Sequence, residues 1–147
     1  SAETELLLFT AARRDHLERV IRPALAAGQV VICDRFADSS RMYQGLSRGD
    51  LRNAVDKLHT LMIGVEPDLT VLVDMDPARG LARANDRGSV DSRFEGFGLA
   101  FQEQMRAGFL NLAQEAAARF RVVDGDATLD VVAARIRAVV TPHLPPQ

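Results

Sequence analysis

Apolar positions recur along the chain at helical spacing in some segments and as short continuous runs in others. Spacings of three, four and seven residues, closed by residues typical of helix ends, predict helices over residues 2–27, 51–63, 77–88, 98–119 and 129–141. Short runs rich in β-branched residues predict buried strands over residues 30–33, 69–73 and 120–123. Strands that alternate with helices are typical of the α/β class, so we expect one domain, residues 1–147, with a doubly wound parallel sheet.

Residues that favour helix termini flank these predicted helices. The expected N-caps are Ser1, Asp50, Asp76 and Thr128. Pro23 lies inside the first predicted helix, where a proline removes a backbone hydrogen bond, so we expect it to bend or loosen the last turn. Leu129 begins the apolar face of the last predicted helix, and we expect its side chain to point inward.

Asp34 and Arg35 directly follow the first predicted strand. Open α/β sheets place their ligands at the carboxyl ends of strands. There an aspartate can hold a Mg²⁺-bound water, and an arginine can bind a phosphate with two hydrogen bonds. The alternative is a solvated strand end with a local ion pair.

Arg13 interrupts the apolar face of the first predicted helix, four residues after Phe9 and four before Leu17. A guanidinium in an apolar surface is unfavourable unless it has a partner. Phe9 and Arg13 together could stack on a planar ring and donate hydrogen bonds to it. The alternative is that Phe9 belongs to the core and that Arg13 reaches solvent.

Residues 85–96 are polar, contain glycine and lack an apolar period. This pattern is typical of a mobile lid over a site, and it would bring Arg83, Arg87 and Arg93 with it. The alternative is an ordinary solvated loop.

Composition narrows the class of protein. Hydrophobic residues make up 47% of the chain, and the formal net charge is −2, which argues against a nucleic-acid-binding surface. Cys33 is the single cysteine, so an internal disulfide and a cysteine-based zinc site are excluded. We find no apolar run long enough for a membrane span and no signal peptide, so we expect a soluble cytoplasmic protein without membrane contact.

A series of short motifs follows in a characteristic order. The motifs are LLFTAAR (residues 7–13), IRPAL (21–25), CDRF (33–36), SSRMYQG (39–45), EPDLT (66–70), LVD (72–74) and RFE (93–95). Together they resemble bacterial thymidylate kinases, which are P-loop nucleoside monophosphate kinases. The resemblance implies a three-layer α/β/α fold, phosphorylation of dTMP to dTDP with ATP and Mg²⁺, a cytoplasmic location and a homodimer.

The same resemblance assigns residues to the acceptor nucleotide. Phe9 would stack on thymine and Arg13 would donate to its carbonyl. Ser40 would hydrogen-bond the base. Tyr43 would close on the 2′ position of the sugar and favour deoxyribose, and Gln44 would line the same pocket.

Further residues would serve the phosphates and ATP. Arg35 would hold the dTMP phosphate, and Asp34 would lie near the phosphates and contact Mg²⁺ through water. Arg87 and Arg93 would be catalytic arginines of the lid. The residues assigned to ATP are Arg83, Asp126 and Ala127.

One part of the family pattern has no counterpart in the sequence. No Gly-x-x-x-x-Gly-Lys-Ser/Thr motif occurs, and the chain contains no Gly-Lys pair. We therefore expect that these residues are part of a longer polypeptide, incomplete at the N-terminus, and that alone they do not catalyse transfer. Two alternatives stay open: another nucleoside or nucleotide kinase of this fold, and a non-catalytic nucleotide-binding module.

Overall fold

The chain divides after Glu66 into two units, Ser1–Glu66 and Pro67–Gln147. The computed structural model describes residues 1–46, 51–86 and 98–145. Helices and parallel strands are both present, so the predicted α/β class is confirmed. Among the described residues, no helix has the length and apolar character needed to cross a membrane.

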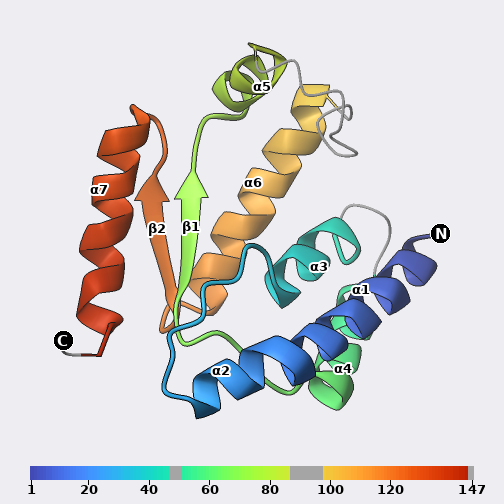
Figure 1. The fold of residues 1–147 in the computed structure, drawn as a ribbon. Helices are drawn as coiled ribbons and strands as arrows, with labels where there is room; N and C mark the ends of the chain where they lie inside the picture. The colour runs from blue at the N-terminus through green and yellow to red at the C-terminus, as the bar shows by residue number, and fades with distance from the viewer. Residues whose placement is uncertain (47–50, 87–97, 146–147) are drawn as a thin grey trace. The chain divides into compact units, whose positions relative to one another are not determined.

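The first unit begins with a long helical segment (Figure 1). It consists of α1 (Ala2–His16), a π-helical turn η1 (Leu17–Ile21) and α2 (Arg22–Ala26), which follow one another without a break. Ser1 caps this segment, because its hydroxyl accepts a hydrogen bond from the backbone N–H of Thr4 at 3.3 Å. The predicted helix over residues 2–27 and its N-cap are thus confirmed.

Pro23 loosens the helix in the turn that precedes it. The backbone N–H of Arg22 donates to the carbonyl of Leu17, five residues back, as in a π-helix. The helix then continues to Ala26. Gly28 ends it with a φ of 73°, a conformation that glycine adopts without a steric penalty.

Two shorter helices complete this unit, α3 (Ala37–Tyr43) and α4 (Arg52–Met62). The predicted helix over residues 51–63 is therefore confirmed, whereas its expected cap, Asp50, lies outside the described residues. The apolar core joins the long helix to the segments around α4. Its buried members are Leu17, Ile21 and Ile63, and Val31, Phe36 and Val65 pack against them.

The predicted strand over residues 30–33 is wrong. These residues are not a strand: Val31 packs against the core, while Val30 and Ile32 are 54% and 92% exposed. A strand exists only where a neighbouring backbone pairs with it. An apolar run predicts burial but does not supply that partner, and no partner strand occurs among the described residues.

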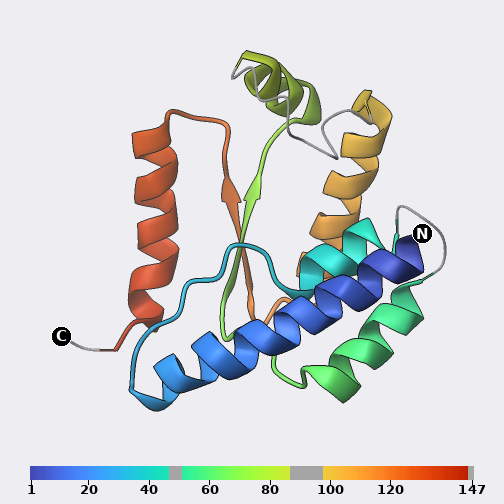
Figure 2. The same ribbon diagram turned by 45° about the vertical axis from the view of Figure 1, so that its right-hand side comes forward.

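The second unit contains a two-stranded parallel sheet, so the expectation of three paired strands is not met within the described residues. Strands β1 (Thr70–Asp74) and β2 (Phe120–Asp124) pair in register from Thr70 opposite Phe120 to Asp74 opposite Asp124. The strands lie between α6 (Gly98–Glu115) and α7 (Leu129–Val140) in both ribbon views (Figures 1 and 2).

The connection from β1 begins with α5 (Pro77–Asp86). Asp76 caps α5 as predicted, because its carboxylate accepts from the backbone N–H groups of Ala78 and Arg79 at 3.0 and 3.1 Å. Residues 87–97, which include most of the predicted lid, lie outside the described part of the chain.

Two details of the later helices differ from the prediction. Helix α6 ends at Glu115 rather than near residue 119, because the last alanines form a turn that leads into β2. Leu129 is 89% exposed rather than inward, since it is the first residue of α7 and lies before the turns that pack on the sheet. A short 3₁₀ turn (Thr141–His143) follows α7.

Candidate functional site

In the first unit, α1 and α3 bring two predicted binding residues into contact. Arg13 on α1 donates from Nη2 to the hydroxyl of Ser40 on α3 at 2.9 Å and to the carbonyl of Phe36 at 3.3 Å. Its guanidinium also lies over the Phe36 ring, 5.4 Å from the centroid. The segment of Phe36 and Ser40 therefore provides this arginine with two acceptors and an aromatic surface.

The environment of Arg13 makes the charged form of its guanidinium less favourable than it is in water. Burial lowers the pKa of this guanidinium, and the nearby charge of Arg41 lowers it further. Asp38 and Glu66 act in the opposite direction. An acceptor atom placed against Arg13 would thus meet a donor that is partly removed from water, where a hydrogen bond is stronger.

Arg35 and Tyr43 form a second contact in this unit. The Arg35 guanidinium lies 5.3 Å from the centroid of the Tyr43 ring. Arg35 has a φ of 68°, a left-handed conformation that is uncommon for residues other than glycine and is often found at functional sites. The adjacent Asp34 is exposed.

The remaining predicted acceptor-site residues differ in exposure. The side chain of Phe9 is on the surface, since the residue is 42% exposed, and it can offer a ring face to a ligand. Gln44 is 2% exposed, and its amide Nε2 donates to the Glu5 carboxylate at 3.4 Å. Gln44 therefore contacts α1 within the protein.

In the second unit, the predicted ATP-site residues Arg83, Asp126 and Ala127 lie together. Arg83 on α5 donates to the carbonyls of Gly125 and Ala127, each at 3.2 Å, and its Nη2 lies 3.9 Å from an oxygen of Asp126. These bonds hold the loop after β2 against α5. The sheet positions this loop, because the N–H of Gly125 donates to the carbonyl of Asp74 at 2.7 Å.

Asp126 has a partner that the sequence analysis missed. Arg79, one turn before Arg83 on α5, forms an ion pair with Oδ2 of Asp126. Oδ1 of Asp126 is buried and accepts no hydrogen bond within the described part of the chain. The spacing of Arg79 and Arg83 at positions i and i+4 could have indicated that both arginines face the same ligand or loop.

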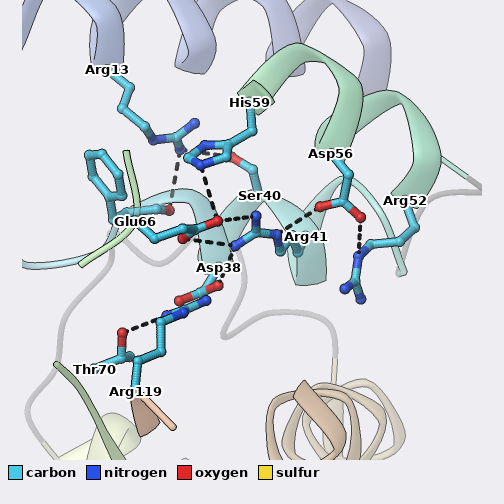
Figure 3. Close-up of polar contacts among 11 residues, drawn as sticks. Arg13, Asp38, Ser40, Arg41, Arg52, Asp56, His59, Glu66, Thr70 and Arg119 are labelled. Atoms are coloured by element: carbon cyan, nitrogen blue, oxygen red, sulfur yellow. Dashed lines mark hydrogen bonds and ion pairs between the residues drawn. The ribbon is translucent and has the colours of Figure 1, made fainter. Parts of the chain in front are cut away.

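A larger omission is the environment of Arg41. Arg41 binds three carboxylates, those of Asp38, Asp56 and Glu66, within the first unit (Figure 3). The spacing of Asp38 and Arg41 at positions i and i+3 was visible in the sequence. The other two partners follow much later in the chain, so only folding reveals them.

The predicted lid arginines and the predicted metal contact remain to be located. Arg87 and Arg93 belong to residues 87–97, which the structure does not describe. Among the described residues, no group of three or more His, Cys, Asp or Glu side chains could hold a metal ion. Asp34 is exposed, so its carboxylate is accessible to a hydrated Mg²⁺, an ion that normally keeps several waters and binds substrate phosphates.

The chain is similar to thymidylate kinases along nearly its whole length. The family model described as thymidylate kinase matches residues 1–136. The thymidylate kinase of Ruegeria pomeroyi is 69% identical over 144 residues, which are 98% of this chain and 68% of that protein. That of Dinoroseobacter shibae is 60% identical over 141 residues, which are 96% of this chain and 68% of that protein.

A solved structure agrees with the sequence relatives. The crystal structure of thymidylate kinase from Ehrlichia chaffeensis matches with a TM-score of 0.73 and 29% sequence identity. The match covers 95% of this chain and 67% of that chain.

Proposed function

Because the chain belongs to the thymidylate kinase family, we propose that residues of its first unit bind dTMP and that residues of its second unit contact ATP. The family reaction transfers the γ-phosphoryl group of ATP to dTMP and yields dTDP and ADP. The observation that carries the residue assignment is the 2.9 Å contact between Arg13 and Ser40. We also propose that both units belong to one kinase domain.

The donors of Arg13 suit a pyrimidine carbonyl. Both of its hydrogen bonds to described residues come from Nη2, so Nη1 and Nε can serve a ligand. Thymine presents the O4 acceptor where cytosine presents an N4–H₂ donor. A fixed guanidinium would therefore accept thymine and oppose cytosine, while Phe9 would stack on the ring.

Sugar and phosphate recognition would follow from Tyr43 and Arg35. The ring of Tyr43 would occupy the space that a ribose 2′-hydroxyl needs and thus favour deoxyribose. Arg35, held against that ring, would donate two hydrogen bonds to the dTMP phosphate. We propose that Gln44 supports this pocket through its contact with Glu5.

Donor binding would depend on the second unit. We propose that Arg83, Asp126 and Ala127 contact ATP, since these residues already form one bonded group. Arg87 and Arg93 would bring positive charge to the transferred phosphoryl group. Bound Mg²⁺ would neutralise phosphate charge, and Asp34 would hold one of its waters.

In this mechanism the protein positions groups and balances charge. Phosphoryl transfer requires the acceptor phosphate to lie in line with the γ-phosphate, and little covalent chemistry falls to side chains. Arg35 would fix the attacking oxygen, and the lid arginines would stabilise the charge that spreads over the transferred group. We further propose a cytoplasmic homodimer.

The test compares acceptor nucleotides in the complete gene product. We expect Arg13→Met to raise KM for dTMP roughly 10- to 100-fold, because a hydrogen bond from a charged group contributes about 1.5–3 kcal/mol. The preference for dTMP over dCMP should fall as well, since the opposing donor is gone. Steady-state kinetics with dTMP, dUMP, dCMP and thymidine measures both effects.

Arg14→Met is the matched control. Arg14 is the next residue of α1 and binds Glu18 and the carbonyl of Met62, so its loss should leave the acceptor preference unchanged. An unchanged dTMP-to-dCMP ratio in Arg13→Met would refute the assignment of Arg13. Preference for another acceptor in the unmodified protein would favour a different nucleoside or nucleotide kinase, and binding without turnover would favour the non-catalytic module.

A further inference from the structure

Arg41 connects three separate segments of the first unit. Its Nη1 donates to Asp38 on α3 at 2.7 Å, and its Nε donates to Asp56 on α4 at 2.8 Å. Nη2 and Nη1 donate to the two oxygens of Glu66 at 2.5 and 3.3 Å. Figure 3 shows the guanidinium between these three carboxylates.

The Arg41 side chain is only 9% exposed, and that of Asp38 only 10%. Burial alone would lower the pKa of Arg41, but the hydrogen bonds that Arg41 donates to Glu66, Asp56 and Asp38 outweigh burial and raise it. Loss of the guanidinium would remove an ion-pair partner from the buried carboxylate of Asp38, which is unfavourable. The three carboxylates are therefore held together by Arg41.

Helix α3 depends on tertiary contacts for its position. It has seven residues, from Ala37 to Tyr43, and its N-terminus receives no side-chain cap. A helix this short is not stable by itself in water, so tertiary contacts decide where it lies. The bonds from Arg41 to α4 and to Glu66 are such contacts.

The residue before Arg41 is the hydroxyl acceptor of the candidate base site. Ser40 is 2% exposed and receives the 2.9 Å hydrogen bond from Arg13. Any shift of α3 against α1 would change this contact. Asp38 and Glu66 also offset the repulsion between Arg41 and Arg13, so the same group of charges keeps the two arginines close.

We propose that Arg41 is a positioning residue for nucleotide recognition: by binding α3 to α4 and to Glu66, it places Ser40 opposite Arg13 and so sets the base that the site accepts. The inference rests on the proposed function of Arg13 and Ser40 in dTMP binding. Arg41 acts through Ser40 and makes no contact with the nucleotide.

A double-mutant comparison in the complete gene product tests this role. Arg41→Met should raise KM for dTMP roughly fivefold or more, with a smaller change in kcat, and should weaken the preference for dTMP over dCMP. Ser40→Ala should do the same. Because both changes disturb one contact, the double variant should be little worse than either single variant.

Two further variants keep the test decisive. Asp56→Asn is milder, since the Asp56 side chain is 42% exposed, and it should shift KM in the same direction if Arg41→Met fails to fold. Arg19→Met is the matched control. Arg19 forms an exposed ion pair with Asp15, with 2.6 Å between Nε and Oδ1, and it does not belong to the Arg41 group. Its kinetics should not change.

Three results would overturn the inference. The first is a lower melting temperature of Arg41→Met with unchanged KM and base preference, which would mean a purely structural role. The second concerns KM for dTMP: the increases caused by Arg41→Met and Ser40→Ala multiply in the double variant. If Arg41→Met does not fold, the corresponding result is an unchanged KM in Asp56→Asn. The third is normal dTMP binding by Ser40→Ala and Arg13→Met, which would remove the proposed function itself and is visible without any change at Arg41.

Discussion

Single residues in the first unit are positioned by direct contacts with other segments. The sequence predicted that Arg13 needs a partner on its apolar helix face, and the structure provides Ser40 and the Phe36 carbonyl. The alternative in which Arg13 extends to solvent is wrong. The contact between Arg13 and thymine stays a prediction.

Gly45 illustrates a constraint of backbone approach. A Cβ atom at this position would lie 2.2 Å from the carbonyl oxygen of Arg41 and 3.2 Å from Cα of Arg52, and neither backbone atom can yield easily. We expect Gly45→Ala to destabilise the protein by about 1–3 kcal/mol, as overpacking does. Denaturant unfolding measures the change.

Gly80→Ala is the comparison for Gly45→Ala. A Cβ atom at Gly80, within α5, would meet only the flexible Met75 side chain at 3.9 Å. Because alanine favours helix more than glycine by about 1 kcal/mol, this variant should be neutral or more stable. Equal effects of the two substitutions would contradict the argument from close approach.

At the scale of elements, the predicted helices and the caps Ser1 and Asp76 were confirmed, whereas Thr128 makes no side-chain cap hydrogen bond and the first strand is absent. Spacing predicted the long N-terminal helix, α4 and α7, and the extended runs predicted β1 and β2. Residues 30–33 have the same apolar character as β1 but have no pairing partner in the described chain. A helix satisfies its backbone internally, whereas a strand depends on another segment.

The cap of α5 permits a direct test at this scale. Asp76 accepts from two backbone N–H groups at the start of α5, and we expect Asp76→Ala to lower the free energy of unfolding by about 1 kcal/mol. Thr128→Ala is the matched control, since Thr128 precedes α7 without a side-chain cap hydrogen bond. Thermal and denaturant unfolding would show the difference, and equal losses would contradict the capping argument.

At the scale of the whole molecule, ion pairs between distant segments link stability to pH in both units. Burial alone would raise the pKa of Glu66, but hydrogen bonds from His59 and Arg41 outweigh it and lower the pKa to about 2. Arg41 and Arg52 likewise outweigh burial and lower the pKa of Asp56. In the second unit, two hydrogen bonds from Arg106 lower the pKa of Asp74.

These shifts fix the direction of the pH dependence. A carboxyl with a depressed pKa in the folded state stabilises the protein above its ordinary pKa, which is 4.5 for Glu66. That contribution is lost as the pH falls from about 4.5 towards about 2. We therefore expect the free energy of unfolding to decrease over this interval.

Glu66→Gln should be less stable than the unmodified protein at neutral pH and should lose less stability on acidification. Urea unfolding at several pH values measures both quantities. The pH dependence of the free energy of unfolding that remains in Glu66→Gln would come from carboxyls such as Asp56 and Asp74. An identical slope in the two proteins would show that Glu66 does not contribute.

The sequence by itself determined local features of this protein: the helices other than α3, the caps at Ser1 and Asp76, the apolar runs of β1 and β2, and the motifs that indicated the thymidylate kinase family. These depend on neighbours within a few residues, which a linear pattern contains. Only the tertiary structure decided that residues 30–33 do not pair and that Arg41 meets Asp56 and Glu66. Strand pairing and buried charge both require a partner distant in the chain, and folding alone brings such partners together.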